Sequence, residues 1–126
     1  MSEFGALCDI KTPDFSFADE RGTICQLLHG GFRQVNVVFT KRGAQRGRFH
    51  YHKINEELFY IISGRIRVTL RLGDQSEERV FGTGDMFQIH KEVRHDFVFL
   101  EDTLLVGCYD RGVELRKGEK DIYIDA

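Results

Sequence analysis

Hydrophobic and polar residues alternate along several short segments of this chain. The cleanest alternation is RIRVTLRL at residues 65–72, in which every second residue is aliphatic. Successive side chains of a β-strand point to opposite faces, so this period of two predicts a strand with one buried face. QVNVVFT at residues 34–40 has the same period, with Val35, Val37 and Phe39 on one face. Further strands are expected at residues 7–10, 15–17, 23–28, 57–62, 77–81, 86–89, 95–100 and 104–109, and around His50 and His52.

Turns rich in Gly and Asp separate these segments, and no segment has the period of an amphipathic helix. This organisation predicts an all-β fold, a small antiparallel β-barrel or sandwich. Alternate residues of barrel strands line the interior, so several strands can aim polar groups at one cavity. We expect one domain over residues 1–126, with its core at about 20–110. The charged tail at 111–126 is expected to be disordered or to add a strand to a partner's sheet.

Composition narrows the class of protein. The chain is 41% hydrophobic and 30% charged, as in ordinary soluble domains, and its net charge of −2 argues against a nucleic-acid partner. No apolar run reaches the roughly 18 residues of a membrane span, and the first residues lack a secretory signal. Cys8, Cys25 and Cys108 are widely spaced. We therefore expect reduced, mostly buried thiols in a cytoplasmic protein.

A group of metal-ligand residue types stands in RGRFHYHKINEELFYIISG, which spans residues 46–64. His50 and His52 are two apart, so on a strand they share a face and lie about 6.6 Å apart along it. Glu57 follows at the start of the next expected strand. Two imidazoles and a carboxylate converging on one point make most of a metal site.

The spacing His50-x-His52-x4-Glu57-x6-Gly64 resembles the first motif of the cupin superfamily. Gly84-Asp85, an apolar stretch and then His95 resemble its second motif, with departures from the family pattern at His90, Glu92 and Phe99. The resemblance implies a jelly-roll barrel, the double-stranded β-helix. It also implies a metal bound by His50, His52, Glu57 and His95, which suits divalent Zn, Fe, Mn, Ni or Cu.

A narrower resemblance connects the chain with cupins that modify nucleotide-linked sugars. Residues 19–22 (DERG), residues 34–37 (QVNV), the basic loop and the segment around His50 are similar to dTDP-sugar 3,4-ketoisomerases, to 3,5-epimerases and to the carboxy-terminal cupin of capsular nucleotide-sugar reductases. The ketoisomerases generally lack the motif's Glu, which is present here as Glu57, and this favours a metal-holding relative. The resemblance implies isomerisation or epimerisation of a keto-sugar, with His50, His52 and His95 as catalytic residues.

A basic loop precedes the histidines, and it contains Lys41, Arg42, Arg46 and Arg48. Arginine forks match phosphate oxygens, so Arg46 and Arg48 are candidates for binding a diphosphate. Arg48, two residues before His50, is expected to share its face. A charged loop is more often only solvated, which is the competing interpretation. By the same parity, Glu56 is expected to point away from Glu57, and His90 to be a surface group or a support for the site.

Two other functions stay open at this level. A metal centre with free positions also suits oxygen chemistry, as in a dioxygenase acting on a small oxidisable substrate. The fold also serves sensors and binding modules that catalyse nothing. For all three functions we expect a small-molecule ligand, such as a nucleotide sugar, and a homodimer.

Overall fold

The computed structural model describes residues 7–115 and 118–125. Within these residues the regular elements are eleven β-strands, paired throughout in antiparallel fashion. They are β1 (Cys8–Lys11), β2 (Phe15–Asp19), β3 (Gly22–Gln26), β4 (Gln34–Thr40), β5 (Gln45–His50), β6 (Glu57–Ser63), β7 (Arg65–Leu72), β8 (Gln75–Gly82), β9 (Met86–Ile89), β10 (Arg94–Phe99) and β11 (Thr103–Tyr109). No helix among the described residues is long and apolar enough to cross a membrane.

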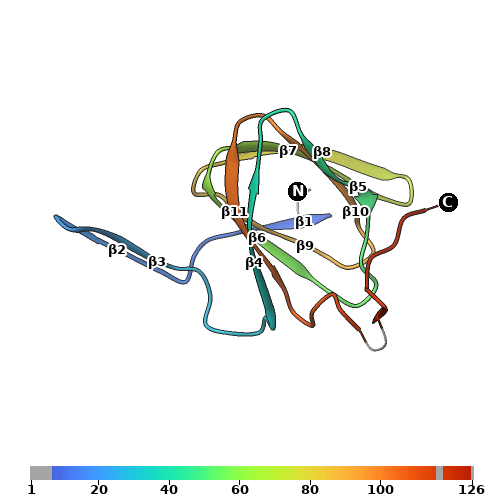
Figure 1. Ribbon diagram of the computed structural model, residues 1–126, viewed down its shortest axis with the longest axis horizontal. Helices are drawn as coiled ribbons and strands as arrows, with labels where there is room; N and C mark the ends of the chain where they lie inside the picture. Colours follow the sequence, from blue (N-terminus) through green and yellow to red (C-terminus); the bar gives the residue numbers. More distant parts are fainter. Residues whose placement is uncertain (1–6, 116–117, 126) are drawn as a thin grey trace.

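Two sheets form the body of the molecule (Figure 1). One has the strand order β1-β9-β6-β11-β4 and the other the order β5-β10-β7-β8, which together make a jelly-roll barrel. Ile66, Val68 and Leu70 of β7 are fully buried between the sheets, while the arginines of the same strand face outward. The predicted all-β antiparallel barrel is confirmed.

Phenylalanines fill much of the space between the sheets. The rings of Phe81 and Phe87 stack at 3.9 Å between centroids, and Phe59, Phe97 and Phe99 continue the cluster toward the other end of the barrel. Aromatic pairs of this kind add stability beyond the apolar area that they bury. They also form a rigid wall behind the polar cluster described below.

The segment before His50 differs from the expectation. Residues 41–48 were expected to form a loop, yet β5 begins at Gln45, and it ends at His50 rather than including His52. The cause is a bulge in which Gly47, Arg48 and Phe49 all have positive φ angles, of 100°, 49° and 62°. Arg46 and His50 are four residues apart on β5, but the residues that they pair with on β10, Phe97 and His95, are only two apart.

The bulge is tied to β10 by one buried carboxylate. Asp96 accepts hydrogen bonds from the backbone N–H of Arg48 and from the side-chain amide of Gln45, each at 2.9 Å. Gly47 allows the close approach of the two strands, because a Cβ there would lie 2.8 Å from the carbonyl oxygen of His95. The result is that Arg46 and His50 both border the cavity described below.

The C-terminal segment lies against the chain's own barrel. Tyr123 and Tyr51 exchange backbone hydrogen bonds at 2.9 and 3.0 Å, and Asp121 is completely buried. The tail was expected to be disordered or to add a strand to a partner's sheet, and the described residues 118–125 instead pair with and pack on their own chain. The described segment instead closes the end of the barrel next to His52.

Candidate metal centre

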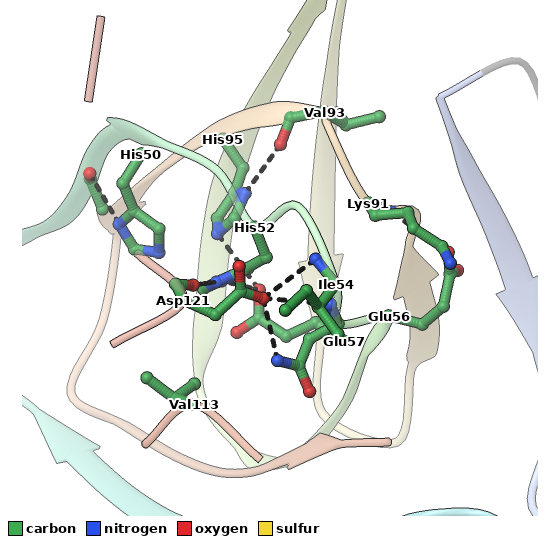
Figure 2. Close-up of polar contacts among 12 residues, drawn as sticks. His50, His52, Ile54, Glu56, Glu57, Lys91, Val93, His95, Val113 and Asp121 are labelled. Carbon is green, nitrogen blue, oxygen red and sulfur yellow. Dashed lines mark hydrogen bonds and ion pairs between the residues drawn. The ribbon is translucent and has the colours of Figure 1, made fainter. Parts of the chain in front are cut away.

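Four side chains from separate parts of the chain converge inside the barrel. His50 ends β5, His52 lies just beyond it, Glu57 begins β6 and His95 lies on β10. One ligand atom from each lies within 4.8 Å of the others (Figure 2). The structure thus brings together all four residues of the predicted ligand set, while their role as ligands stays a prediction.

Each imidazole is held by a backbone carbonyl. Nδ1 of His50 donates to Gly47 O at 2.8 Å, Nδ1 of His95 donates to Val93 O at 3.1 Å, and Nδ1 of His52 donates to Asp121 O. A carbonyl can only accept, so these bonds assign the ring proton to Nδ1. Each ring therefore presents Nε2 to the centre, the arrangement in which outer hydrogen bonds orient metal-binding histidines.

Three polar atoms at the centre are buried without a hydrogen bond. They are Nε2 of His52, Nε2 of His95 and Oε1 of Glu57. The carboxylate oxygen lies 3.0 Å from the first nitrogen and 3.2 Å from the second. Buried polar atoms are costly unless they have a partner, and a divalent cation would satisfy all three together. Three imidazole nitrogens and one carboxylate oxygen fit a transition metal.

Electrostatics favour the ligand forms of two residues. Burial raises the pKa of Glu57, but the imidazoles of His95 and His52 lower it more, so its pKa is well below the usual range. Burial, with help from His95, lowers the pKa of His50 to about 4. At neutral pH Glu57 is therefore ionised and His50 neutral. For His52, burial lowers the pKa, but the Glu57 carboxylate raises it above the ordinary value.

The loop carrying His52 is anchored by two residues that the motif spacing does not reveal. The Asp121 carboxylate accepts backbone N–H groups of Lys53, Ile54 and Asn55, each at 3.0 Å (Figure 2). The Asn55 side chain is itself buried, and it joins Asp121 to Gly112. The C-terminal segment therefore shapes the site through contacts far apart in sequence.

Three of the four residues, His50, Glu57 and His95, border a cavity of about 130 Å³. Its lining consists of Val38, Arg46, Gly47, His50, Glu57, Phe59, His95, Phe97, Phe99, Leu105 and Tyr109. Tyr109 lies opposite Glu57 in the strand register, and burial together with the Glu57 charge raises its pKa, so the phenol stays protonated. Sequence reasoning missed Tyr109, although its place on the inward face of the expected strand at 104–109 was a usable signal.

The two candidate arginines lie in different places. Arg46 lines the cavity, and its Nε donates to Thr40 at 2.8 Å. Arg48 lines a separate pocket with Arg71, Arg94 and Asp125. The expectation that Arg48 shares a face with His50 is wrong, because the positive φ angles of Arg48 and Phe49 break the alternation of a regular strand.

Two other titratable residues lie outside the centre. Glu56 points away from Glu57, as expected from parity, and accepts a hydrogen bond from His90 at 2.7 Å. His90 also lies 3.2 Å from Asp9 on β1. Both residues therefore serve contacts between strands. Of the three free cysteines, Cys8 and Cys108 are buried and Cys25 is exposed.

A jelly-roll barrel with three His and one Glu brought together in its interior defines a class of small β proteins. A family model described as a cupin domain matches residues 36–106, more than half of the chain. This chain belongs to the cupin family. No curated protein matches it in sequence.

Solved structures with the same fold include enzymes that act on nucleotide sugars. One is a double mutant of the 3,4-ketoisomerase QdtA from Thermoanaerobacterium thermosaccharolyticum in complex with TDP, with 17% identity, a TM-score of 0.77 and coverage of 95% of this chain and 88% of that one. Another is the TDP-quinovose 3,4-ketoisomerase WlaRB from Campylobacter jejuni, with 20% identity, a TM-score of 0.76 and coverage of 90% and 92%.

A third is a dTDP-4-dehydrorhamnose 3,5-epimerase from Sulfolobus tokodaii. It has 19% identity, a TM-score of 0.72 and coverage of 86% of this chain and 72% of that one. Identities this low establish a common fold. What those enzymes bind and convert is a property of those enzymes, because the same fold hosts many functions.

Proposed function

We propose that this chain is a metal-binding cupin that isomerises or epimerises a keto-sugar linked to a nucleotide, as a cytoplasmic homodimer. The observation that carries the proposal is the convergence of three imidazoles and the Glu57 carboxylate on one point, next to a cavity that Arg46 and Tyr109 also line. Similarity in fold to ketoisomerases and epimerases supports the choice of substrate.

His50, His52, Glu57 and His95 would hold the metal, which when bound supplies a Lewis acid that polarises a carbonyl. Tyr109 stays protonated and is placed to donate a hydrogen bond to an oxygen that gains negative charge. In the reaction, a C–H bond next to the carbonyl breaks and its electron pair moves toward the carbonyl oxygen. Return of a proton to the same carbon gives an epimer. Where that carbon carries a hydroxyl, return of the proton to the former carbonyl carbon, with transfer of the hydroxyl proton to the former carbonyl oxygen, gives an isomer.

The size of the cavity limits which part of a substrate enters. Ligand pockets usually measure about 300–1,000 Å³, whereas this cavity measures about 130 Å³. The sugar ring would therefore face the metal centre, and the diphosphate and base would lie outside. Arg46 belongs to the cavity lining and is exposed, so its guanidinium suits the diphosphate.

Deuterium uptake tests this function directly. The protein, purified without added metal and analysed for its elements, is incubated in D₂O with dTDP- and UDP-linked 4-keto-sugars. We expect deuterium at a carbon next to the carbonyl, detected by NMR. Glu57→Gln should abolish uptake and Glu56→Gln, at the neighbouring position on the other face, should preserve it. Absence of uptake and of any thermal stabilisation with every sugar would overturn the proposal.

One observation favours a second candidate. The deep wall of the cavity is apolar, formed by Val38, Phe59, Phe97, Phe99 and Leu105. Such a wall suits a small apolar substrate, and the same ligand set suits iron in oxygen chemistry. Oxygen consumption by the iron-loaded protein with a small oxidisable substrate would select this function. Metal binding without turnover in either assay would leave a sensor or binding module.

A further inference from the structure

A second pocket lies at the outer face of the four-stranded sheet, and it measures about 500 Å³. Its walls come from β5, β7, β10 and the C-terminal segment, which runs beside β5 and β10 (Figure 1). Its lining shares no residue with the cavity beside the metal centre. We call it the arginine pocket, because three arginines line it together with an aromatic, an aliphatic and an acidic residue: Arg48, Arg71, Arg94, Phe49, Ile124 and Asp125.

Like charges face each other across two strands of the arginine pocket. Arg71 of β7 and Arg94 of β10 are direct partners in the antiparallel register, and Arg48 belongs to the same lining. Like charges placed directly opposite each other destabilise a sheet. Three arginines and one aspartate, Asp125, leave a net charge of +2 in the lining. The pocket therefore favours the binding of an anion.

Elsewhere on the outward side of β7 the positive charges are balanced. Arg65 and Arg67 precede Arg71 on this side of the strand. Arg65 lies 3.4 Å from the carboxylate of Glu101, and Arg67 lies 3.9 Å from the carboxylate of Glu78. The unbalanced charge is therefore a feature of the arginine pocket and not of every arginine on the sheet.

Aromatic rings hold two of the three guanidinium groups in place. The guanidinium of Arg71 lies 4.0 Å from the ring centre of Phe49, and that of Arg94 lies 3.5 Å from the ring centre of Tyr51. A guanidinium stacked on a ring keeps the N–H groups along its edge for anions. Phe49 and Arg48 reach the pocket through positive φ angles, and strained backbone of this kind gathers at binding sites.

One carboxylate of the chain itself is already bound in the arginine pocket. Nε and Nη2 of Arg94 each donate a hydrogen bond to the carboxylate of Asp125 at 2.9 Å, and Nη1 donates to the backbone oxygen of Glu92. The two parallel bonds are the geometry in which a guanidinium binds a carboxylate or a phosphate. Among residues 7–115 and 118–125, no acceptor takes a hydrogen bond from the guanidinium of Arg48 or Arg71. Two of the three guanidinium groups are therefore left for a second anion.

We propose that the arginine pocket binds a small phosphate monoester, with its phosphate between Arg48 and Arg71. A phosphate monoester carries close to two negative charges at pH 7, which matches the net charge of the lining. The volume of the pocket lies within the range of about 300–1,000 Å³ that ligand pockets span. The pocket therefore also holds the organic group of the ester, against Phe49 and Ile124.

This ligand differs from the proposed substrate of the metal centre. The diphosphate of a nucleotide sugar is esterified at both ends, so each of its phosphates carries a single charge. The proposal is independent of the sugar chemistry, and metal content and turnover are measured separately. Failure of one proposal is therefore distinguishable from failure of the other.

Calorimetric titration of the full chain with glucose 1-phosphate and with inorganic phosphate, at constant ionic strength, tests the site. We expect each probe to bind saturably at one site. Arg71→Gln and Arg48→Gln should each raise the Kd at least about tenfold, through loss of a charged hydrogen bond. Arg67→Gln, on the same strand but paired with Glu78, is the matched control and should change the Kd by no more than about twofold. Arg46→Gln, in the other cavity, should also leave it unchanged.

Asp125→Asn provides a test that misfolding is unable to imitate, because it should tighten binding. Removal of the competing negative charge should lower the Kd at least about threefold. This variant decides if Arg48→Gln or Arg71→Gln does not fold, which circular dichroism checks. Absence of saturable binding of both probes up to about 10 mM would overturn the proposal. So would equal losses in Arg67→Gln and Arg71→Gln, a loss in Arg46→Gln alone, or an unchanged Kd in Asp125→Asn.

Discussion

The backbone carbonyl of Asp121 accepts a hydrogen bond from Nδ1 of His52, 69 positions earlier in the chain. The same residue's carboxylate receives the backbone N–H groups of the three residues that follow the histidine by one to three positions. One buried residue near the C-terminus therefore fixes both the tautomer of a candidate ligand and the loop that carries it. The C-terminal segment is part of the candidate metal centre.

Replacing Asp121 should damage metal binding more than its distance in sequence suggests. Asp121→Ala leaves the backbone N–H groups of Lys53, Ile54 and Asn55 without an acceptor, the last of them buried, which costs about 1–3 kcal/mol of stability. The freed loop should also lower metal affinity about 10–100-fold. Competition titration with a zinc chelator measures the affinity, and urea unfolding measures the stability. Asp125→Ala, which removes only an exposed pair with Arg94, is the control and should alter neither. Unchanged metal affinity in the Asp121 variant would contradict its positioning role.

Glu57→Gln should weaken metal binding and also lower the stability of the metal-free protein near neutral pH. Burial raises the pKa of Glu57, but the imidazoles of His95 and His52 lower it well below its usual range, so the ionised carboxylate stabilises the folded state and a neutral amide loses that contribution. We expect the metal-free variant to be less stable than the wild type, with metal affinity reduced at least about 100-fold. Glu56→Gln provides the matched comparison and should leave affinity unchanged. Equal affinities for the two variants would show that Glu57 is not a ligand.

Metal binding should depend on pH in the direction set by His52. Burial lowers the pKa of His52, but the Glu57 carboxylate raises it above the ordinary value, so the metal-free protein keeps a proton there to a higher pH than an ordinary imidazole does. A metal must displace that proton, and its apparent affinity should rise as pH rises from about 6 to 8, by up to tenfold per unit. His50, with a pKa of about 4, adds no dependence in this range. Calorimetry in two buffers of different ionisation enthalpy counts the released proton. Proton release should shrink in Glu57→Gln, and constant affinity across this range would refute the assignment.

The strands were predictable where both the period and the backbone were regular. β4, β7 and β9 match the expected boundaries: β7 alternates without interruption, and β9 follows directly on the turn at residues 82–85. β5 differs from its expected boundaries, because Arg48 and Phe49 adopt left-handed backbone conformations that their residue types do not predict. Alternation also leaves open which face is buried. The face of β4 with Val35, Val37 and Phe39 is the exposed one.

The candidate site likewise has residues that the sequence predicts and residues that it does not. Motif spacing brought out His50, His52, Glu57 and His95, because these residues occupy fixed positions on paired strands or, for His52, just beyond one. Asp121 was not predictable, since a charged residue in a charged tail gives no sign that it will be buried. Its burial depends on three backbone N–H groups of a loop formed only when the barrel is complete. Contacts of this kind are set by tertiary structure alone.

Gly47 should tolerate no side chain. Its φ of 100° is strained for other residues, and a Cβ would lie 2.8 Å from the carbonyl of His95, so β5 and β10 would have to separate beside two candidate ligands. Gly47→Ala should cost about 2–4 kcal/mol and weaken metal binding. Gly43→Ala is the control, because Gly43 has a φ of 87° with open space around it, and it should cost only about 1 kcal/mol. Equal losses for the two alanines, measured by urea unfolding, would mean that crowding at Gly47 is unimportant.

Replacing Arg46 should weaken substrate binding, whereas replacing Arg48 should not. Arg46 lines the cavity and Arg48 lies in the separate pocket with Arg71, so only the first is placed to contact a diphosphate beside the metal centre. Arg46→Gln should raise the KM or Kd for a nucleotide sugar about tenfold or more, as expected for the loss of a charged hydrogen bond, with metal content unchanged. Arg48→Gln should change neither value by more than about twofold. A larger effect from Arg48 would place the diphosphate outside the barrel, against the four-stranded sheet.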